Sequence, residues 1–248
     1  MRETSLSRRR LLTGSVTLVG AGLVGGCEAP ALRDLTSPYG WSNGLTFAVQ
    51  RWLLRGQPLV REFGPEAISA TFPTINTTDP DDAGYRRSKA SSFADWRLPV
   101  GGLVERPGAF SLAELRAMPS RTQITLHSCE QGWSAIGAWT GVPLAHLLAD
   151  VGLKPEARFI VMRCIDGWWD SYDLFDALHP QTILAYGMNG GDLPVDHGAP
   201  LRLRVERQLG YKSLKYLTSI EAVERVDGLG KGRGSMVAEL GFPWYAGI

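Results

Sequence analysis

Residues 122–133 read TQITLHSCEQGW, and this stretch decides the fold. Polar and apolar side chains alternate over 122–126, which is the period of a β-strand with one buried face. A histidine, a serine and a cysteine follow, and we interpret the next residues as a glycine-containing loop with Trp133 and Trp139. A cysteine released from a strand end into a loop presents its sulfur rather than burying it. Cys129 is therefore the first candidate functional residue.

The residues alone leave two interpretations of Cys129 open. A thiolate is a soft ligand for soft or high-valent metals, and a metal would keep it deprotonated. The alternative is a structural cysteine that forms a disulfide with Cys164 in an oxidising compartment. Both cysteines follow predicted strands, so this placement suits a disulfide as well as a shared pocket.

Strands and short helices alternate along the rest of the chain. A Ser-x-x-Glu capping box predicts a helix over 111–118, and a proline in the first turn predicts another over 143–151. An Asn189-Gly190 pair predicts a hairpin turn. The remaining predicted strands are 98–104, 158–163, 182–188, 193–195, 201–205 and 217–223. This mixture predicts an α+β class with a mixed sheet in a single domain, residues 45–248.

The region before the first predicted strand is less regular. Residues 27–44 read as a tether, and the proline-containing residues 64–97 read as a long loop over the core. Between them, apolar residues at helical spacing predict an amphipathic helix. These residues are Leu45, Val49, Trp52 and Leu53.

A second group of candidate residues lies in HGAPLRLRVERQLGYKSLK, residues 197–215. Arginines and lysines near a glycine-containing turn form an arrangement that binds phosphate. The alternative is a solvated basic face. Arg202 and Arg204 share one face of a strand, and Lys212 and Lys215 have helical spacing, so the pattern is compatible with either.

Composition excludes several classes of protein. The 248 residues include 26 Lys and Arg against 25 Asp and Glu, a formal charge of +1. This balance lacks the basic excess of a nucleic-acid-binding protein. Three cysteines without CxxC or Cys/His finger spacing exclude a disulfide scaffold, an attached c-type haem and a structural zinc module.

The first 26 residues predict an export signal. Consecutive arginines, residues 8–10, precede an uncharged apolar run over 11–26, as in twin-arginine signals that export folded proteins. A membrane anchor is the alternative for a run of this length. Removing the segment takes away four arginines and one glutamate and changes the formal charge from +1 to −2. We expect a periplasmic protein, with Cys27 a candidate for lipidation.

Six motifs, taken in order, resemble the molybdopterin-binding domain of the sulfite oxidase superfamily. Within it, the chain is similar to the exported oxidoreductases that include the catalytic subunit of the periplasmic methionine-sulfoxide reductase. The motifs are VGGLVERP (100–107), CEQGW (129–133), WTGVPL (139–144), DGW (166–168), HGAPLR (197–202) and GYKSLK (210–215). The pairs His179-Pro180 and Asn189-Gly190 lie in order between the fourth and fifth motifs. Their order over more than a hundred residues is far more specific than any one of them.

The resemblance implies a cofactor and the residues that hold it. Cys129 would be the protein ligand to the molybdenum of one molybdopterin, which performs oxygen-atom transfer or two-electron chemistry. His127 would hydrogen-bond near the metal, with a purely structural histidine as the alternative. The other cofactor-binding residues implied by motif position are Asn76, Cys164, His197, Arg202, Lys212, Ser213, Leu214 and Lys215.

Departures from the family pattern point to the substrate. Sulfite oxidases follow the metal-binding cysteine with an arginine-rich loop, whereas this chain has Glu130 and Gln131 there. We therefore expect a neutral sulfoxide or N-oxide rather than sulfite, with reduction as the direction. Asp166 and Trp168 are the candidate catalytic residues, on a loop at the mouth that also holds Trp169 and Tyr172.

The resemblance also bears on partners. The chain has no recognisable haem-binding domain and no C-terminal dimerisation domain of the sulfite oxidase type, so we expect a monomer. Electrons would then come from a separate partner, such as a membrane cytochrome, and the substrate would be a small molecule. Two other functions remain as alternatives: a cysteine-nucleophile cell-wall enzyme, and a metal-free exported binding protein.

Overall fold

The computed structural model describes residues 38–248, which fall into two compact units. The first unit ends at Gly56 and contains α2 (Pro38–Leu53); the second runs from Gln57 to Ile248. The helix predicted around residue 45 is therefore present, but it begins inside the segment that we interpreted as a tether. Residues 1–37, with the predicted export signal and Cys27, lie outside the described part.

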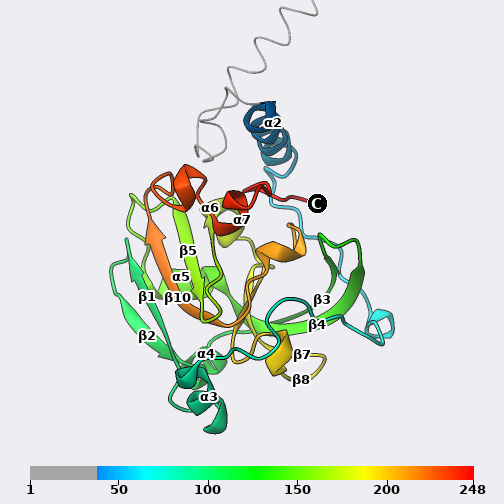
Figure 1. Ribbon diagram of the computed structural model, residues 1–248, viewed down its shortest axis with the longest axis vertical. Coiled ribbons are helices and arrows are strands. Elements are labelled where there is room, and N and C mark those ends of the chain that lie inside the picture. The colour runs from blue at the N-terminus through cyan, green and yellow to red at the C-terminus, as the bar shows by residue number, and fades with distance from the viewer. Residues whose placement is uncertain (1–37) are drawn as a thin grey trace, which may run out of the picture. The chain divides into compact units, whose positions relative to one another are not determined.

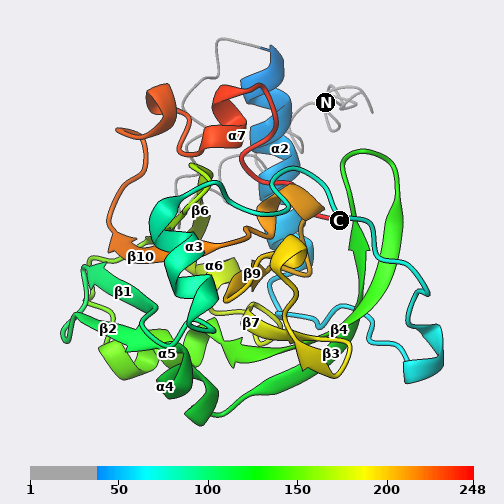
Figure 2. The same ribbon diagram turned by 60° about the horizontal axis from the view of Figure 1, so that its bottom comes forward.

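The second unit contains two β-sheets (Figures 1 and 2). The first sheet has the order β2-β1-β10-β5-β6 and is mixed, because β1 and β10 are parallel and the other neighbours are antiparallel. Its strands are β1 (Arg97–Gly102), β2 (Gly108–Ser111), β5 (Phe159–Cys164), β6 (Trp169–Asp173) and β10 (Leu217–Val223). This mixed sheet confirms the predicted α+β class.

The second sheet is antiparallel, with the order β3-β4-β7-β8 and β9 paired to β7. Figures 1 and 2 show the long β3–β4 hairpin on the side of the unit away from β1 and β2. The strands are β3 (Arg121–Ser128), β4 (Ser134–Pro143), β7 (Ile183–Met188), β8 (Gly191–Asp192) and β9 (Arg202–Arg204). The tight turn between β7 and β8 is the predicted Asn189-Gly190 pair, and both residues have positive φ.

Short helices connect the strands. They are α3 (Ala83–Ala90), α4 (Leu112–Ala117), α5 (Leu144–Val151), α6 (Leu174–Ala177) and α7 (Met236–Glu239). The capping box of α4 is complete, because Ser111 Oγ accepts from the Glu114 N–H while the Glu114 carboxylate accepts from the Ser111 N–H. Side chains of α5 join residues of both sheets in one buried core, including Leu147, Ile160 and Leu203.

Two loop assignments and one strand position from the sequence are wrong. The residues after Gly132 form β4 instead of a loop, so Trp139 is a fully buried strand residue. Residues 64–97 contain α3, which Asp82 caps by accepting the Tyr85 N–H. The strand expected at 193–195 is instead β8, two residues earlier, because the two-residue turn pairs Met188 directly with Gly191.

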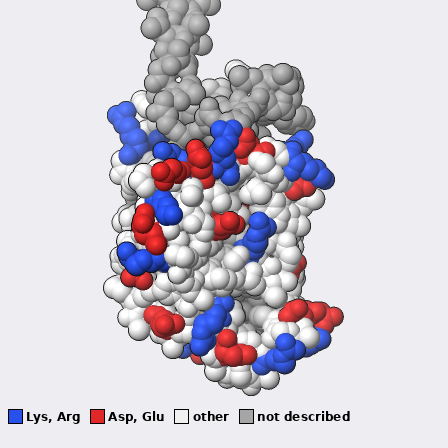
Figure 3. Space-filling model, turned by 90° about the vertical axis from the view of Figure 1, so that its left-hand side faces the viewer, with Lys and Arg blue, Asp and Glu red and all other residues white. Residues whose placement is uncertain are grey.

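The surface of the described residues carries both signs of charge. Figure 3 shows Lys and Arg interspersed with Asp and Glu over the face that contains β1 and β2. No helix among residues 38–248 is long and apolar enough to cross a bilayer.

Candidate active site

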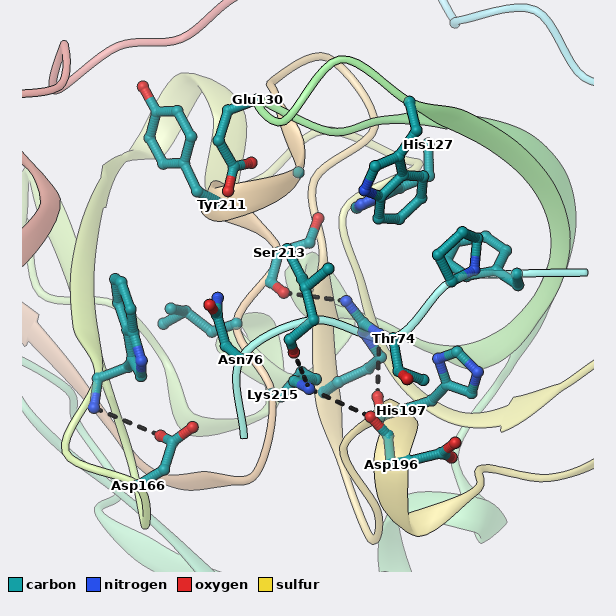
Figure 4. A pocket seen from close by; sticks show the side chains of 18 of the residues that line it. Thr74, Asn76, His127, Glu130, Asp166, Asp196, His197, Tyr211, Ser213 and Lys215 are labelled. Atoms are coloured by element: carbon teal, nitrogen blue, oxygen red, sulfur yellow. Dashed lines mark hydrogen bonds between the residues drawn. The ribbon is translucent and has the colours of Figure 1, made fainter. Parts of the chain in front are cut away.

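One cavity of about 780 Å³, including the part open to solvent, lies in the second unit. Loops from both sheets form its wall: the turn after β3, the β5–β6 turn, and the segments on either side of β9. Figure 4 shows Glu130, Tyr211 and His127 along one side of the cavity and Asp166 and Asp196 along the other. Strand ends from separate sheets thus bring residues distant in sequence to one place.

Two cations in the cavity wall have no carboxylate partner at ion-pair distance among residues 38–248. The Arg202 guanidinium donates to the backbone oxygens of His197 (2.9 Å) and Ser213 (3.0 Å), and its Nε has no hydrogen-bond partner. Lys215 Nζ donates to the backbone oxygens of Ile75 (2.8 Å) and Asp196 (3.1 Å) and also to Thr77. A cation in a cavity wall whose hydrogen bonds go to carbonyl oxygens rather than to a carboxylate is suited to an anionic ligand.

Burial, followed by a neighbouring cation, lowers the pKa of both side chains. Burial, together with Arg204, lowers the pKa of Arg202 to about 9. Burial and the neighbouring Arg202 lower the pKa of Lys215 to about 8. An anion bound between the two cations would reverse both shifts.

The other basic residues of this segment are paired. Arg204 binds Glu206, Arg207 binds Asp176, and Lys212 binds Asp170 at 2.6 Å. Lys212 is fully buried, donates also to the Ser171 carbonyl, and does not line the cavity. The structure thus separates Lys212 from Lys215, because residues 210–212 form one 3-10 turn and the helical spacing does not continue.

Cys129 lies in the turn after β3. Its N–H donates to the Trp133 carbonyl (2.9 Å), and its Sγ lies 3.5 Å from both the Gln131 N–H and a Glu130 carboxylate oxygen. The thiol is buried, and burial followed by Glu130 raises its pKa. Cys129 is itself not part of the cavity wall, although His127 and Glu130 on either side of it are.

Cys164 is placed differently from the expectation. It ends β5, packs in the hydrophobic core and does not line the cavity. Burial, with Asp166 and Asp170 nearby, raises its pKa well above the usual value. Both cysteines are free thiols, so the structure contains no disulfide between them.

The remaining predicted cofactor-binding residues line the cavity together: Asn76, His127, His197, Ser213 and Leu214. Asn76 adopts positive φ between Ile75 and Thr77, whose carbonyls both accept from Lys215. Burial, as the largest cause, lowers the pKa values of His197 and His127, that of His127 to about 2. The His127 ring is therefore neutral at pH 7.

Asp166 and Trp168 also line the cavity, in the turn between β5 and β6. The Trp168 N–H lies 3.4 Å from Asp166 Oδ1, and burial raises the pKa of the carboxyl group. Trp169 and Tyr172 are not on this loop: they belong to β6, where Tyr172 is buried and donates its hydroxyl to the Lys212 carbonyl. Of the aromatic residues expected on this loop, only Trp168 is therefore part of it.

Aromatic residues from elsewhere in the chain complete the wall, and sequence patterns did not identify them. Phe72 makes edge contacts with the rings of Trp133 (6.0 Å) and His197 (5.5 Å). Near the C-terminus, Phe242 packs against Tyr211 at 5.3 Å, and Val237 lines the cavity beside it. The only local signal was the aromatic density of GFPWY, residues 241–245.

A family model for the oxidoreductase molybdopterin-binding domain matches residues 86–228. The chain is 35% identical to a putative protein-methionine-sulfoxide reductase subunit, YedZ1, of Azospira oryzae, over 97% of this chain and 88% of the relative. It is 30% identical to the MsrP catalytic subunit of protein-methionine-sulfoxide reductase from Xanthomonas axonopodis, over 88% of this chain and 70% of the relative.

Among solved structures, the sulfane dehydrogenase SoxCD of Paracoccus pantotrophus is similar, with a TM-score of 0.51 and 27% identity. The match covers 53% of this chain and 39% of that chain.

Proposed function

The chain belongs to the oxidoreductase molybdopterin-binding domain family, and from this premise we propose that it reduces a neutral sulfoxide or N-oxide by oxygen-atom transfer. The observation that carries the proposal is the pair of buried Arg202 and half-buried Lys215, two cations in one cavity wall without a carboxylate at ion-pair distance among residues 38–248. Such a pair suits the phosphate of the cofactor. Relatives named methionine-sulfoxide reductase subunits support the reaction class.

The residues present fit molybdopterin. Among the described residues, no group accepts a hydrogen bond from the buried Nε of Arg202, and Lys215 lines the same cavity. Ser213 and Leu214 lie between these two cations along the chain, with Asn76 and His197 on the facing segments. The Cys129 thiol would be the protein ligand to molybdenum, which would stabilise the thiolate against the effect of burial.

When bound, the cofactor supplies two-electron oxygen-atom transfer. A sulfoxide takes two electrons and two protons to give a sulfide and water. Asp166 is the cavity carboxyl group whose pKa is raised, so we propose that it holds a proton for the water that forms. Trp168, Trp133 and Phe72 would pack against the apolar body of the substrate and exclude water.

The charge near Cys129 favours a neutral substrate over sulfite. Glu130 is the charged residue of the turn, and it lies 3.5 Å from the Cys129 sulfur. A carboxylate beside the proposed metal ligand would repel a dianion. The cations of the cavity wall are Arg202 and Lys215. We assign both to the cofactor phosphate, which would neutralise them.

We further propose export by the twin-arginine route to the periplasm, with Cys27 as the candidate for lipidation. Electrons would come from a separate membrane partner such as a cytochrome. The chain would bind this partner as a monomer. The words "subunit" and "catalytic subunit" in the names of the relatives support a second component.

A cysteine-nucleophile mechanism is less compatible with this geometry. An activated nucleophile needs a lowered pKa or an adjacent base, whereas burial raises the pKa of Cys129. The nearby His127 already accepts a hydrogen bond from Arg204 on Nδ1.

The test is a substrate panel with protein matured in a host that makes molybdopterin. We expect methionine sulfoxide or dimethyl sulfoxide to drive oxidation of a reduced viologen dye, and we expect Cys129→Ser to abolish this turnover. Dye reduction by sulfite without sulfoxide turnover would overturn the substrate assignment. Covalent labelling of Cys129 by a β-lactam would favour the nucleophile alternative.

A further inference from the structure

His127 connects the cavity with a buried ion pair. It is the penultimate residue of β3, its side chain is almost fully buried, and its ring lines the cavity. On the inner side, His127 Nδ1 lies 2.7 Å from Arg204 Nη1. A guanidinium has donors and no acceptor, so Nδ1 must accept this hydrogen bond. The ring proton is therefore on Nε2.

Arg204 is held in place from several directions. Its Nε and Nη2 donate to the two carboxylate oxygens of Glu206, at 3.0 and 2.7 Å. Glu206 also accepts from Gln123 Nε2 at 2.9 Å, and the guanidinium stacks on the Trp139 ring at 4.4 Å. The side chains of both Arg204 and Glu206 are at most 1% exposed. The guanidinium is therefore fixed while it donates to His127.

The outer side of the ring is kept open by a glycine. The rings of Phe72 and Trp133 flank His127 at 5.5 and 5.4 Å. A Cβ atom at Gly210 would lie 2.5 Å from His127 Nε2, so only glycine leaves this space free. Among residues 38–248, no protein group accepts a hydrogen bond from Nε2. Gly210 and His127 both line the cavity.

We propose that Arg204 is a positioning residue that fixes His127 as the Nε2–H tautomer, so that the ring donates a hydrogen bond to an acceptor atom of the group bound in the cavity. The acceptor is an oxygen or nitrogen atom of the pterin or the oxygen of the substrate. The identity of this acceptor rests on the proposed function, whereas the His127 tautomer does not.

Nitrogen NMR of the metal-free full chain, labelled with ¹⁵N-histidine, tests the tautomer directly. The chain has four histidines, and exposed His146 is the internal control. We expect His127 to show a protonated Nε2 and an accepting Nδ1, and Arg204→Lys, which keeps a donor, to preserve this pattern. An Nδ1–H signal or an averaged signal in the wild-type protein would overturn the proposal.

Removing the donor should release the tautomer without unfolding the protein. The double variant Arg204→Met/Glu206→Gln leaves no unpaired charge and keeps an acceptor for Gln123. We expect the His127 signals to change to an averaged or Nδ1–H pattern, while those of His146 stay unchanged. An unchanged His127 pattern in the folded double variant would show that Arg204 does not position the ring.

Two further variants test donation to the ligand. Gly210→Ala should displace the ring, and His127→Phe should keep the ring packing while removing the donor. Loss of one hydrogen bond predicts about a five- to tenfold effect. A fall in molybdenum content assigns the acceptor to the cofactor, and a raised KM with full metal content assigns it to the substrate. No change in either quantity would overturn the donation.

If the wild-type protein carries no molybdenum after maturation, the proposed function fails. The NMR test of the His127 tautomer uses the metal-free chain, so its outcome does not depend on the proposed function.

Discussion

Lys212 and Lys215 lie three residues apart but have opposite surroundings. Lys212 is fully buried against Asp170, and its ammonium also lies over the rings of Tyr172 and Trp244. Lys215 reaches the cavity and contacts backbone carbonyls. Helical spacing placed both lysines on one face, and only the end of the 3-10 turn separates them. A local pattern cannot show which of two cations is already neutralised.

Replacing these lysines should therefore have different effects. Lys212→Met leaves Asp170 as an uncompensated buried charge, so we expect the free energy of unfolding to fall by about 3–5 kcal/mol. Lys215→Met should change it by about 1 kcal/mol or less and instead reduce the molybdopterin content. Urea unfolding of the metal-free variants and cofactor extraction measure the two effects. Cofactor loss with unchanged stability in Lys212→Met would contradict this assignment.

At the level of secondary-structure elements, local signals predicted those parts of the fold that depend on neighbouring residues. The capping box at Ser111 and Glu114 and the Asn189-Gly190 turn are formed as expected. These signals act over three or four residues, so they do not require knowledge of the tertiary structure.

Strands β4 and β6 were missed for tertiary reasons. The glycines that make β4 resemble a loop are needed for close packing: a Cβ at Gly141 would lie 2.1 Å from the Leu184 carbonyl oxygen. In β6, polar residues that suggest a loop are buried and paired, because Asp170 binds Lys212 and Ser171 donates to the Gly234 carbonyl. Neither partner is near in sequence.

Gly141 gives a prediction for β4. Gly141→Ala would force β4 away from the β7 backbone, so we expect a loss of about 2 kcal/mol or more in the free energy of unfolding. Gly101→Ala in β1 is the matched control, because nothing lies within 4 Å of its Cβ position. Thermal and urea unfolding compare the two variants. Equal stability would show that β4 can move away from β7 at little cost.

At the scale of the whole molecule, ordered motifs predicted more than any single pattern. They identified the family, the fold class and about half of the cavity wall, including His197, Arg202 and Lys215. They did not identify Phe72 or Phe242, because these residues reach the cavity from loops outside the motifs. Cys164 was expected at the cofactor, but its place at the end of β5 puts it in the core.

The buried histidines predict how the stability of the fold depends on pH. Burial, with Arg207 next, lowers the pKa of His179 to about 4 from an ordinary value of 6.5. The unfolded chain therefore binds a proton below pH 6.5 that the folded chain does not bind until about pH 4. This contribution is fully present above pH 6.5 and is lost as the pH falls, at about 1.4 kcal/mol per pH unit.

In His179→Gln, the free energy of unfolding should accordingly fall less steeply between pH 6 and pH 4.5. The difference in slope from the wild type should correspond to about one proton. His146→Gln, at an exposed position on α5, is the matched control for the substitution itself. Urea unfolding of the metal-free proteins across this pH range gives the slopes. An identical slope for His179→Gln and the wild type would show that His179 does not titrate on unfolding.

The central claim is that Cys129 binds the molybdenum of a molybdopterin in this chain. Its most direct test is molybdenum analysis together with X-ray absorption at the molybdenum edge, on the wild type, Cys129→Ser and Cys164→Ser. We expect about one molybdenum atom per chain in the wild type, loss of one sulfur ligand or of the metal in Cys129→Ser, and the wild-type spectrum in Cys164→Ser. A matured wild-type protein without molybdenum, or a Cys129→Ser spectrum identical to that of the wild type, would contradict the claim.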